Sequence, residues 1–211
     1  MKLTVTAFIT LDGVMQGPGA PDEDRSNGFD HGGWLVPHTD EEFGRAVDDI
    51  FGRVDEFLLG RTTYDMMYGY WSQLADSEDT VARALNTLPK HVASRSTSGF
   101  EWANTDRLEG DVVEAVRGLK ERPGRELQVH GSHGLVQTLL AAGLVDEINL
   151  FIAPVVVGEG KRLFGDGAVP MSMRLASSHV TGSGMIVATY RPGGPLVQQA
   201  FEIVDGDEVV V

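Results

Sequence analysis

The feature that most constrains the fold is an alternation of short apolar strands with helices, in which three strands end at a polar turn. These turns are Gly60-Arg61-Thr62-Thr63, Ser94-Arg95-Ser96 and Gly131-Ser132-His133-Gly134. The alternation favours a parallel sheet, because parallel strands need a crossover connection that is usually helical. Residues 174–181 and 185–191 flank Gly182-Ser183-Gly184 and predict a terminal hairpin. The sequence therefore predicts a layered α/β fold with a mostly parallel sheet and an antiparallel edge.

Hydrophobic periodicity and turn residues divide the chain into elements. The expected strands cover residues 3–11, 56–59, 90–94, 100–104, 126–130 and 147–157, and the expected helices lie within residues 39–51, 62–68, 79–88, 111–122 and 135–142. Thr39 is the expected N-cap of the first helix, where Glu42 would complete a capping box. Gly143 is the expected C-cap of the last helix.

The length of 211 residues suits one compact domain, which we expect to span residues 1–192. Residues 193–211 form a tail with alternating apolar residues, and this tail predicts an added strand or an arm on a partner subunit. Residues 16–33 form a long loop rich in Gly, Pro and Asp. A loop of this length in a compact domain is usually functional or disordered.

Composition narrows the classes of function. The absence of cysteine excludes disulfides and thiolate metal sites, and it suits a reducing compartment. A formal net charge of −14 argues against nucleic-acid binding, because an acidic surface repels phosphate backbones. The sequence shows neither a signal-peptide pattern nor an apolar run long enough to span a bilayer, so we expect a cytoplasmic protein without a membrane partner. A phosphorylated ligand would need a local basic or amide-rich pocket.

The strand–turn–helix segment through Gly131-Ser132-His133-Gly134 is the strongest local signal for such a pocket. Glycines let the backbone approach a ligand, and a helix N-terminus presents amides and a positive dipole to phosphate. A tight turn without a ligand is the alternative, since the full dinucleotide-binding fingerprint is absent. The same turn superficially resembles a nucleophile elbow, but it lacks the G-x-S-x-G spacing of a serine hydrolase.

The two other turns have the same ambiguity when each is considered alone. Arg61 with Thr62 could bind an anion or could simply begin a helix, and Arg95 between Ser94 and Ser96 suits a phosphate monoester or a plain polar turn. The occurrence of all three turns in one chain is stronger evidence for an anion site than any single turn. Three anion-competent turns follow three strands, at the strand ends where open α/β sheets bind ligands.

Other polar groups give weaker signals. His130 and His133 are three residues apart across a strand end, and no carboxylate pattern accompanies them, so we expect no metal site. The acidic run from Asp40 to Glu42 is expected to cap a helix, with a catalytic carboxylate among its members as the less favoured interpretation.

Several ordered segments resemble the family of the riboflavin-biosynthesis reductase C-terminal domain, which is itself similar to dihydrofolate reductase. The resemblance covers residues 1–192 and rests on the segments ITLDGVMQG, GGWLVP, LLGRTTYDMM, KHVASRS, VHGSHGLVQTLL, VDEINLFIAPVVVGEGKRLF and IVATYRP. It implies a dihydrofolate-reductase-like three-layer α/β fold, with a mostly parallel central sheet and an antiparallel C-terminal hairpin. It also implies a homodimer.

The resemblance implies that NADPH is the hydride donor. The two glycine-containing turns would hold the pyrophosphate through Gly60, Arg61, Thr62, Gly131, Ser132, His133, Gly134 and Leu135. Ser94, Arg95 and Ser96 would lie near the adenosine ribose phosphate. The segment from Phe8 to Gln16 would lie beside the nicotinamide, with backbone contacts from Phe8 and Met15.

On the substrate side, the resemblance suggests a catalytic set of Asp40, Trp34 and Asp12. In dihydrofolate reductases a carboxylate follows a Trp-x-x-Pro segment, but here the ungapped match to that carboxylate is Thr39, and Asp40 comes one residue later. Lys161 and Arg162 are the candidate contacts for a ribose phosphate.

The expected activity is reduction of a small heterocyclic or ribosylated substrate, similar to 5-amino-6-(5-phosphoribosylamino)uracil reductase. The alternatives are a pterin reductase of the dihydrofolate reductase type and a non-catalytic, dimeric nucleotide-binding module of the same fold.

Overall fold

A computed structural model describes residues 1–96, 98–204 and 206–210. The eight-stranded sheet has the order β4-β3-β2-β5-β1-β6-β8-β7. Its strands are β1 (Lys2–Thr10), β2 (Val54–Gly60), β3 (Lys90–Ala93), β4 (Thr105–Arg107), β5 (Glu126–His130), β6 (Glu147–Ala153), β7 (Met171–Val180) and β8 (Ile186–Pro195). All strand pairs from β4 to β6 are parallel, whereas β8 is antiparallel to both β6 and β7. The predicted mostly parallel sheet with an antiparallel C-terminal hairpin is therefore confirmed.

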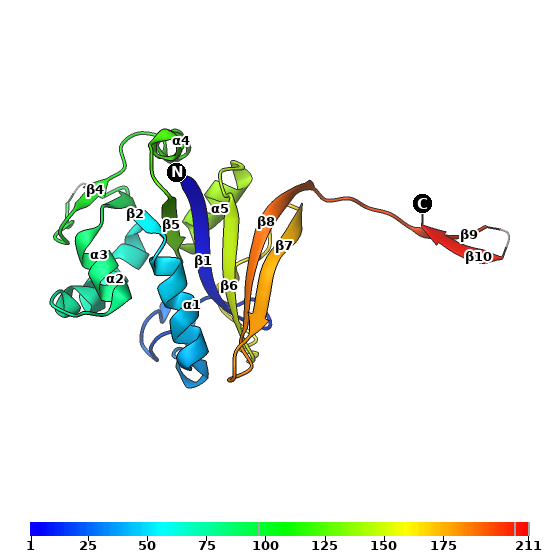
Figure 1. Cartoon of the computed structure of the whole chain (residues 1–211), viewed down its shortest axis with the longest axis horizontal. Coiled ribbons are helices and arrows are strands. Elements are labelled where there is room, and N and C mark those ends of the chain that lie inside the picture. The colour runs from blue at the N-terminus through cyan, green and yellow to red at the C-terminus, as the bar shows by residue number, and fades with distance from the viewer. Residues whose placement is uncertain (97, 205, 211) are drawn as a thin grey trace.

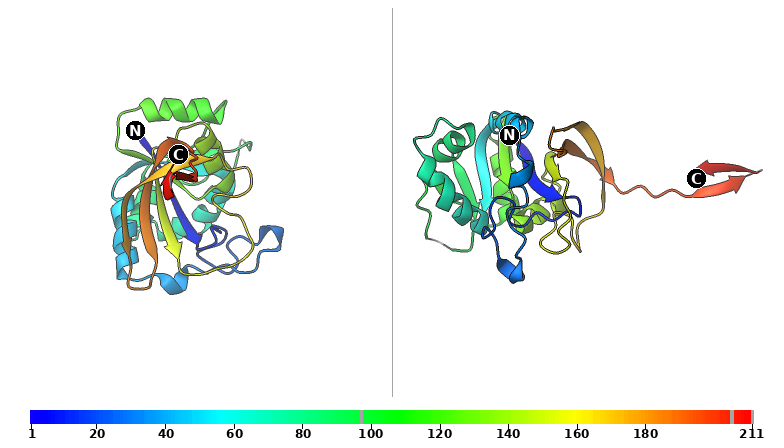
Figure 2. Two further views of the ribbon diagram at one scale, coloured as in Figure 1. Left: turned by 90° about the vertical axis from the view of Figure 1, so that its right-hand side faces the viewer. Right: turned by 90° about the horizontal axis from the view of Figure 1, so that it is seen from below.

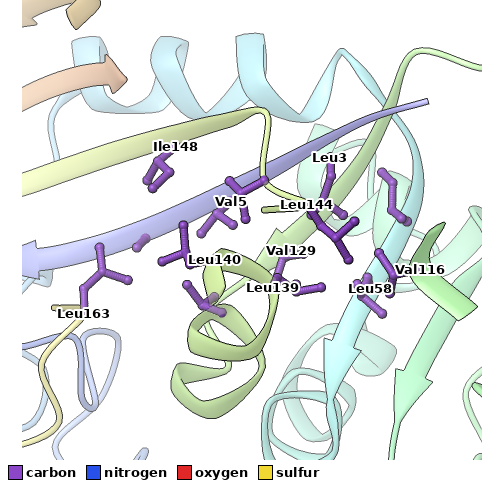
Figure 3. Packing of buried hydrophobic residues seen from close by; sticks show 14 of the residues in the cluster. Leu3, Val5, Leu58, Val116, Val129, Leu139, Leu140, Leu144, Ile148 and Leu163 are labelled. Atoms are coloured by element: carbon purple, nitrogen blue, oxygen red, sulfur yellow. The ribbon is translucent and has the colours of Figure 1, made fainter. Parts of the chain in front are cut away.

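The helices form layers on both faces of this sheet (Figure 1). They are α1 (Glu41–Phe51), α2 (Arg61–Trp71), α3 (Thr80–Thr87), α4 (Val112–Glu121) and α5 (His133–Ala141), with short 3-10 turns at Ser26–Gly28, Val36–His38 and Ser72–Leu74. One face packs against α4 and α5, where Val116 and Leu139 meet Val5 of β1 in a single core cluster (Figure 3). The other face packs against α1 and α3 through two further clusters. This arrangement is the predicted three-layer fold.

The central strands are buried on both faces, because helices cover each side of the sheet. Every residue of β5 is buried, and so is all of β6 except Ile152. At the far end of this core, Gly143 adopts φ +64° and ends α5 in a Schellman motif, with its amide bonded to Leu140 and the Leu144 amide bonded to Leu139. The glycine stop predicted for this helix is present, one residue after the C-cap Ala142.

Four expected boundaries are wrong in detail. Residues 100–104 contain no strand: the Trp102 amide donates to Tyr64 Oη at 3.0 Å, and the next strand is β4. β6 ends at Ala153 because Pro154 has no amide to donate. α5 starts two residues earlier than expected, at His133. β8 continues to Pro195, past the strand end expected at residue 191.

The predicted N-cap of α1 is also wrong. The Thr39 hydroxyl donates to the Val36 carbonyl at 2.8 Å, so it does not accept from the helix. Asp40 is the N-cap, and its Oδ1 accepts from the Phe43 amide at 2.8 Å. A carboxylate both accepts from free amides and interacts favourably with the helix dipole, and this makes it the better cap.

Residues beyond β8 leave the body of the protein and form a second sheet of two strands, β9 (Phe201–Val204) and β10 (Asp207–Val210). This hairpin lies away from the other elements in Figure 1. Among the described residues, no helix is both long enough and apolar enough to cross a membrane.

Candidate functional site

The three polar turns lie together at one edge of the sheet. They follow β3, β2 and β5, which are adjacent and parallel in the order β3-β2-β5. The carboxyl ends of parallel strands meet at the same edge, and ligands of open α/β sheets bind outside that edge. The topology thus brings together residues as distant in the sequence as Gly60 and Ser132, which are 72 positions apart.

Ser132 joins two of these turns directly. Its Oγ accepts a hydrogen bond from the Gly60 amide at 2.8 Å and donates to Thr63 Oγ1 at 2.8 Å. Ser132 adopts the left-handed conformation, with φ 64° and ψ 65°, which is uncommon for a residue with a side chain. A Cβ atom at position 60 would lie 2.7 Å from Ser132 Oγ, so only glycine permits this approach. The two helix starts are therefore held side by side.

The two helices that begin at this junction differ from the others in their capping. An aspartate side chain caps α1, α3 and α4, through Asp40, Asp79 and Asp111. α2 follows Gly60 and α5 follows Ser132, and neither has a side-chain cap. Their first-turn amides are thus left to an outside acceptor, and two helix dipoles add their positive ends there. This arrangement is suited to an anion with more than one charged group.

Arg61 at the start of α2 binds its own protein surroundings. Its Nη1 donates to the Ser98 carbonyl at 2.8 Å, and its Nε donates to Asp65 Oδ2 at 2.8 Å. The guanidinium also lies over the Phe100 ring, 5.1 Å from the centroid. The side chain that sequence reasoning assigned to an anion instead ties α2 to the loop after β3.

That loop carries the third predicted turn. The Ser96 amide donates to Ser94 Oγ at 3.0 Å, which folds the turn, and Arg95 is exposed. Within the parts of the chain that the structure describes, the Arg95 guanidinium has no ion-pair partner. Arg95 is therefore the cation at this edge that a phosphate group could pair with.

Asp12, just after β1, organises the neighbouring loops. Its carboxylate accepts from Thr10 Oγ1 at 2.6 Å and from the Val157 and Gly158 amides at 3.2 and 2.8 Å. The Thr10 hydroxyl and these amides lower the pKa of Asp12 to about 2. Arg162 lies against it, with Nη2 3.3 Å from Oδ2. Asp12 is thus an ionised residue that holds the segment after β6 against the end of β1.

Lys161 fixes the long loop of residues 16–33. Its Nζ lies 2.7 Å from Asp24 Oδ2 and 2.7 Å from Ser26 Oγ. Lys161 and Arg162, the two expected phosphate contacts, are therefore both paired with carboxylates of their own chain.

Gln16, expected only as the last residue of the segment from Phe8 to Gln16 and without a role of its own, is the centre of the polar contacts in this loop. It is buried, its Nε2 donates to the Asp24 and Ser26 carbonyls at 3.1 and 3.0 Å, and its Oε1 accepts from the Lys161 amide at 3.0 Å. The Gln16 carbonyl accepts from Trp34 Nε1 at 2.8 Å. The only sequence signal for this role was the position of Gln16 at the junction between a strand end and a glycine-rich loop.

The remaining predicted residues lie near these loops. Phe8 on β1 packs its ring against Phe43 and Phe151, with centroids 5.9 and 5.0 Å away. The Met15 amide donates to the Lys161 carbonyl at 2.8 Å. Trp34 is buried in the cluster under α1.

Asp40 is fully engaged in contacts with its own chain. Besides capping α1, it accepts from the Ser183 amide at 2.8 Å through Oδ2, which anchors the tip of the β7–β8 hairpin. The Phe43 amide in particular holds the pKa of Asp40 below its usual value. Asp40 is consequently a deprotonated acceptor at neutral pH.

One group of possible metal ligands occurs among the described residues, namely Asp30, His31 and Glu159. All three side chains are exposed, and His31 Nε2 lies 3.4 Å from Asp30 and 3.8 Å from Glu159. Exposed acidic groups are common without a metal, and the group lies away from the three turns in sequence.

Comparison with known proteins identifies a matching family and a related protein. A family model described as the RibD C-terminal domain matches residues 1–187. The chain is 27% identical to the uncharacterised protein YyaP of Bacillus subtilis (strain 168), over 92% of this chain and 96% of that protein.

Solved structures share the fold. A Shewanella sp. PV-4 protein named for riboflavin biosynthesis has a TM-score of 0.65 at 22% identity, covering 91% of this chain and 99% of its own. The Thermotoga maritima diaminohydroxyphosphoribosylaminopyrimidine deaminase/5-amino-6-(5-phosphoribosylamino)uracil reductase has a TM-score of 0.59 at 17% identity, covering 90% and 56%. Enterococcus faecalis dihydrofolate reductase complexed with NADP(H) has a TM-score of 0.56 at 15% identity, covering 91% and 96%.

Proposed function

Since the chain belongs to the RibD C-terminal domain family, we propose that it is an NADPH-dependent reductase of a small heterocyclic or ribosylated substrate. The substrate class resembles that of the riboflavin-pathway reductase, whose Thermotoga maritima form shares this fold. The single observation that carries the proposal is the pair of uncapped helix N-termini joined by Ser132 at the carboxyl edge of the sheet.

The structural features of this edge fit a dinucleotide. A pyrophosphate carries two adjacent charged groups, and the first turns of α2 and α5 offer amides for both. Gly60, Arg61 and Thr62 would hold it from one side through backbone groups and the Thr62 hydroxyl, and the segment from Gly131 to Leu135 would hold it from the other. In this scheme Ser132 is a positioning residue, because its hydroxyl is already bonded to Gly60 and Thr63.

Arg95 would supply the preference for NADPH. It is exposed at the end of β3, flanked by Ser94 and Ser96, and it suits the extra phosphate monoester that distinguishes NADPH from NADH. A chain with a net charge of −14 offers that phosphate little general attraction, so a local cation matters more here than in a basic protein.

The bound cofactor would supply the hydride. The chain itself would orient the ring with backbone groups of Phe8 and Met15. We propose that Asp12 and Trp34 act by ordering the flanking loops, Asp12 through the Gly158 amide and Trp34 through the Gln16 carbonyl. Asp40 would hold α1 against the hairpin tip. A substrate phosphate at Lys161 or Arg162 would have to displace Asp24 or Asp12, so the pairing favours a substrate recognised mainly by its heterocycle.

Titration of the protein with NADPH and NADH, followed by Trp fluorescence or calorimetry, tests the proposal. We expect NADPH to bind at least about tenfold more tightly than NADH, equivalent to about 1.4 kcal/mol. Arg95→Ala should remove most of this difference while NADH binding stays unchanged. Absence of binding by either nucleotide at about 1 mM would overturn the proposal, and equal losses for both would remove the role of Arg95.

Two glycine-to-alanine substitutions test the contact between Gly60 and Ser132 that joins the starts of α2 and α5. Gly60→Ala introduces a Cβ that meets Ser132 Oγ, so it should separate the two helix starts and weaken NADPH binding at least about tenfold. Gly69→Ala in the same helix is the matched control, because its Cβ would meet open space. We expect Gly69→Ala to bind NADPH normally and to be slightly stabilised. Equal affinities for both variants would contradict the assignment of the pyrophosphate to this junction.

A non-catalytic nucleotide-binding module of the same fold is the second candidate, and the engagement of both Asp40 oxygens favours it. Oxidation of NADPH in the presence of riboflavin precursors or pterins distinguishes the two. Turnover of any of these compounds supports the reductase, whereas NADPH binding without turnover across the panel supports the module.

Three further predictions accompany the reductase proposal. The protein is expected to act in the cytoplasm, to avoid nucleic acid because of its acidity, and to form a homodimer.

A further inference from the structure

The loop between β3 and β4 carries Arg95, and contacts from α2 hold this loop. The first is made by the Arg61 guanidinium, whose Nη1 donates to the Ser98 carbonyl at 2.8 Å. The same carbonyl accepts from Ser96 Oγ at 3.1 Å. One backbone oxygen therefore connects the start of α2 to the residue that directly follows Arg95.

Aromatic side chains reinforce this attachment. The Arg61 guanidinium lies 5.1 Å from the centroid of the Phe100 ring, and the Tyr64 ring meets that ring edge-on with centroids 5.7 Å apart. The Tyr64 hydroxyl also accepts from the Trp102 amide at 3.0 Å. Side chains three residues apart in a helix lie on the same face. Residues 98–102 are thus held against one face of α2 by two neighbouring side chains.

The loop lies at the margin of the sheet. β4, the strand that follows it, is the last strand on that side of the sheet order. In Figure 1 and in the view from below in Figure 2, β4 and α2 lie at the end of the molecule opposite the hairpin of β9 and β10. Arg95, Ser96 and Ser98 are all exposed. Because exposed segments with few buried contacts open at little cost in free energy, the attachment to α2 controls how well Arg95 is ordered.

Two neighbours fix the Arg61 side chain itself. Asp65 Oδ2 accepts from its Nε at 2.8 Å, one helical turn along α2. A planar guanidinium can bind Asp65 along one edge and Ser98 along the other, which a lysine cannot do. Gly99 lies against the guanidinium with φ +78°, and a Cβ atom there would lie 2.9 Å from Nη2. The loop therefore approaches Arg61 at a point where only glycine fits.

We propose that Arg61 is a positioning residue that sets the preference for NADPH by ordering the turn of Arg95, without a contact between its own side chain and the nucleotide. This inference rests on the proposed nucleotide site, in which backbone groups at the start of α2 hold the pyrophosphate. The contact of Arg61 with Ser98 then fixes the separation between the pyrophosphate and the Arg95 guanidinium. A cation that is ordered before binding loses less conformational entropy when it pairs with a phosphate.

Binding of NADPH and NADH to Arg61→Ala, measured by calorimetry, tests the proposal. NADPH should bind about tenfold more weakly than to the unmodified chain. NADH lacks the extra phosphate, and its affinity should stay the same because alanine keeps the backbone groups of α2. A side chain that bound the pyrophosphate would weaken both nucleotides equally, since both contain that group. Equal losses would therefore overturn the proposal.

A double-mutant cycle distinguishes positioning from a second direct contact with the extra phosphate. If Arg61 acts only through the turn, Arg61→Ala should have no further effect in a chain that already carries Arg95→Ala. Two direct contacts would give independent losses, so additive losses contradict the proposal. Arg61→Lys should resemble Arg61→Ala, because a lysine keeps the charge without the planar donor set. A full NADPH preference in Arg61→Lys would also contradict it.

A substitution on the loop side of the contact leaves Arg61 intact. Gly99→Ala should weaken NADPH binding selectively, because its Cβ would meet the guanidinium. Gly110→Ala is the matched control, since Gly110 also has a positive φ, +71°, but its Cβ would meet open space. The control introduces similar backbone strain without the clash and should keep the NADPH preference. The same preference in both variants would be evidence against the contact.

Hydrogen exchange in the absence of nucleotide separates a failure of this proposal from a failure of the proposed function. Amides of residues 98–102 should exchange at least about tenfold faster in Arg61→Ala, whereas those of α5 should be unchanged. If the unmodified chain binds neither nucleotide, the proposed function fails even when the loop exchanges faster. If both nucleotides bind and Arg61→Ala changes neither loop exchange nor NADPH preference, the positioning role of Arg61 alone is wrong.

Discussion

At the scale of the residue, His130 shows how burial sets the charge of a polar group. It is the last residue of a polar row on one face of β5, in which Glu126 bonds to Gln128 at 2.8 Å and Gln128 bonds to His130 at 3.0 Å. The His130 ring stacks on Phe51 with centroids 4.6 Å apart. Desolvation lowers the pKa of His130 to about 4, so the imidazole is neutral at physiological pH.

This shifted pKa predicts a loss of stability in mild acid. A histidine whose folded pKa lies below its unfolded value of 6.5 contributes fully above pH 6.5, and the contribution is lost as the pH falls toward about 4. The free energy of unfolding should fall by up to about 1.4 kcal/mol per pH unit from this group. Urea denaturation at several pH values should show a shallower dependence for His130→Gln than for the unmodified chain. The exposed His31→Gln is the control, and identical slopes for His130→Gln and the unmodified chain would refute the assignment.

Asp40 illustrates how one residue position changes the chemistry that a motif suggests. The resemblance to dihydrofolate reductase suggests a catalytic role for Asp40, the first acid after Trp34-Leu35-Val36-Pro37. In the structure that acid caps α1 and anchors the Ser183 amide, and the Phe43 amide keeps its pKa low. A carboxylate that is stabilised in its charged form does not donate a proton at neutral pH.

Two substitutions separate capping from proton donation at this position. Asp40→Ala should lower the thermal unfolding midpoint, whereas Asp40→Asn keeps an oxygen that can accept from Phe43 and should retain most of the stability. Because we assign no proton transfer to this side chain, Asp40→Asn should also retain the rate of NADPH oxidation on a turned-over substrate. A folded Asp40→Asn protein that binds NADPH but is inactive would restore the acid role.

At the scale of the element, two loops far apart in sequence form one unit beside the sheet edge. The Val14 and Arg162 backbones form a bridge, and the Leu163 amide donates to the Gly13 carbonyl at 2.9 Å. Gln16 and Lys161 extend this contact into the loop of residues 16–33. The long Gly- and Pro-rich segment, whose regular structure includes only the 3-10 turn at Ser26–Gly28, is thereby held by polar contacts together with the buried Phe29 ring.

A substitution at Lys161 tests the contact between the loop of residues 16–33 and the segment after β6 most directly. Lys161→Met keeps the aliphatic stem but removes the ammonium group between Asp24 and Ser26, leaving the mostly buried Asp24 carboxylate without its cation. Amides of residues 24–28 should then exchange with solvent at least about tenfold faster, whereas those of β1 should be unaffected. Hydrogen exchange measured by mass spectrometry provides the comparison, with the exposed Arg45→Met as a control. Unchanged exchange in the loop would show that Gln16 alone is sufficient.

At the scale of the whole molecule, the sheet order determines which turns can cooperate. Placing β2 between β3 and β5 makes the three polar turns neighbours, while the hairpin of β7 and β8 lies at the opposite end of the sheet. Charge also varies along the C-terminal part of the chain, because residues 171–195 contain no Asp or Glu whereas residues 196–211 contain four acidic residues and no Lys or Arg. The candidate nucleotide edge and the hairpin of β7 and β8 therefore lie in separate parts of one sheet.

The sequence by itself determined the elements and their layering, because helical and strand periodicity, glycine stops and polar turns are encoded within a few neighbouring residues. It therefore predicted the parallel sheet, the final hairpin and the three polar turns. Short-range signals failed where a distant group competed, as when Tyr64 took the amide of Trp102 from an expected strand.

Only the tertiary structure decided which polar side chains were already engaged. Asp40, Arg61, Lys161 and Arg162 each met a partner from another loop or helix turn, and no local pattern distinguishes a paired charge from one that awaits a ligand. The same holds for the junction of Ser132 with Gly60, which joins residues 72 positions apart. Such contacts depend on the order in which strands assemble, and that order is set by the packing of the whole sheet.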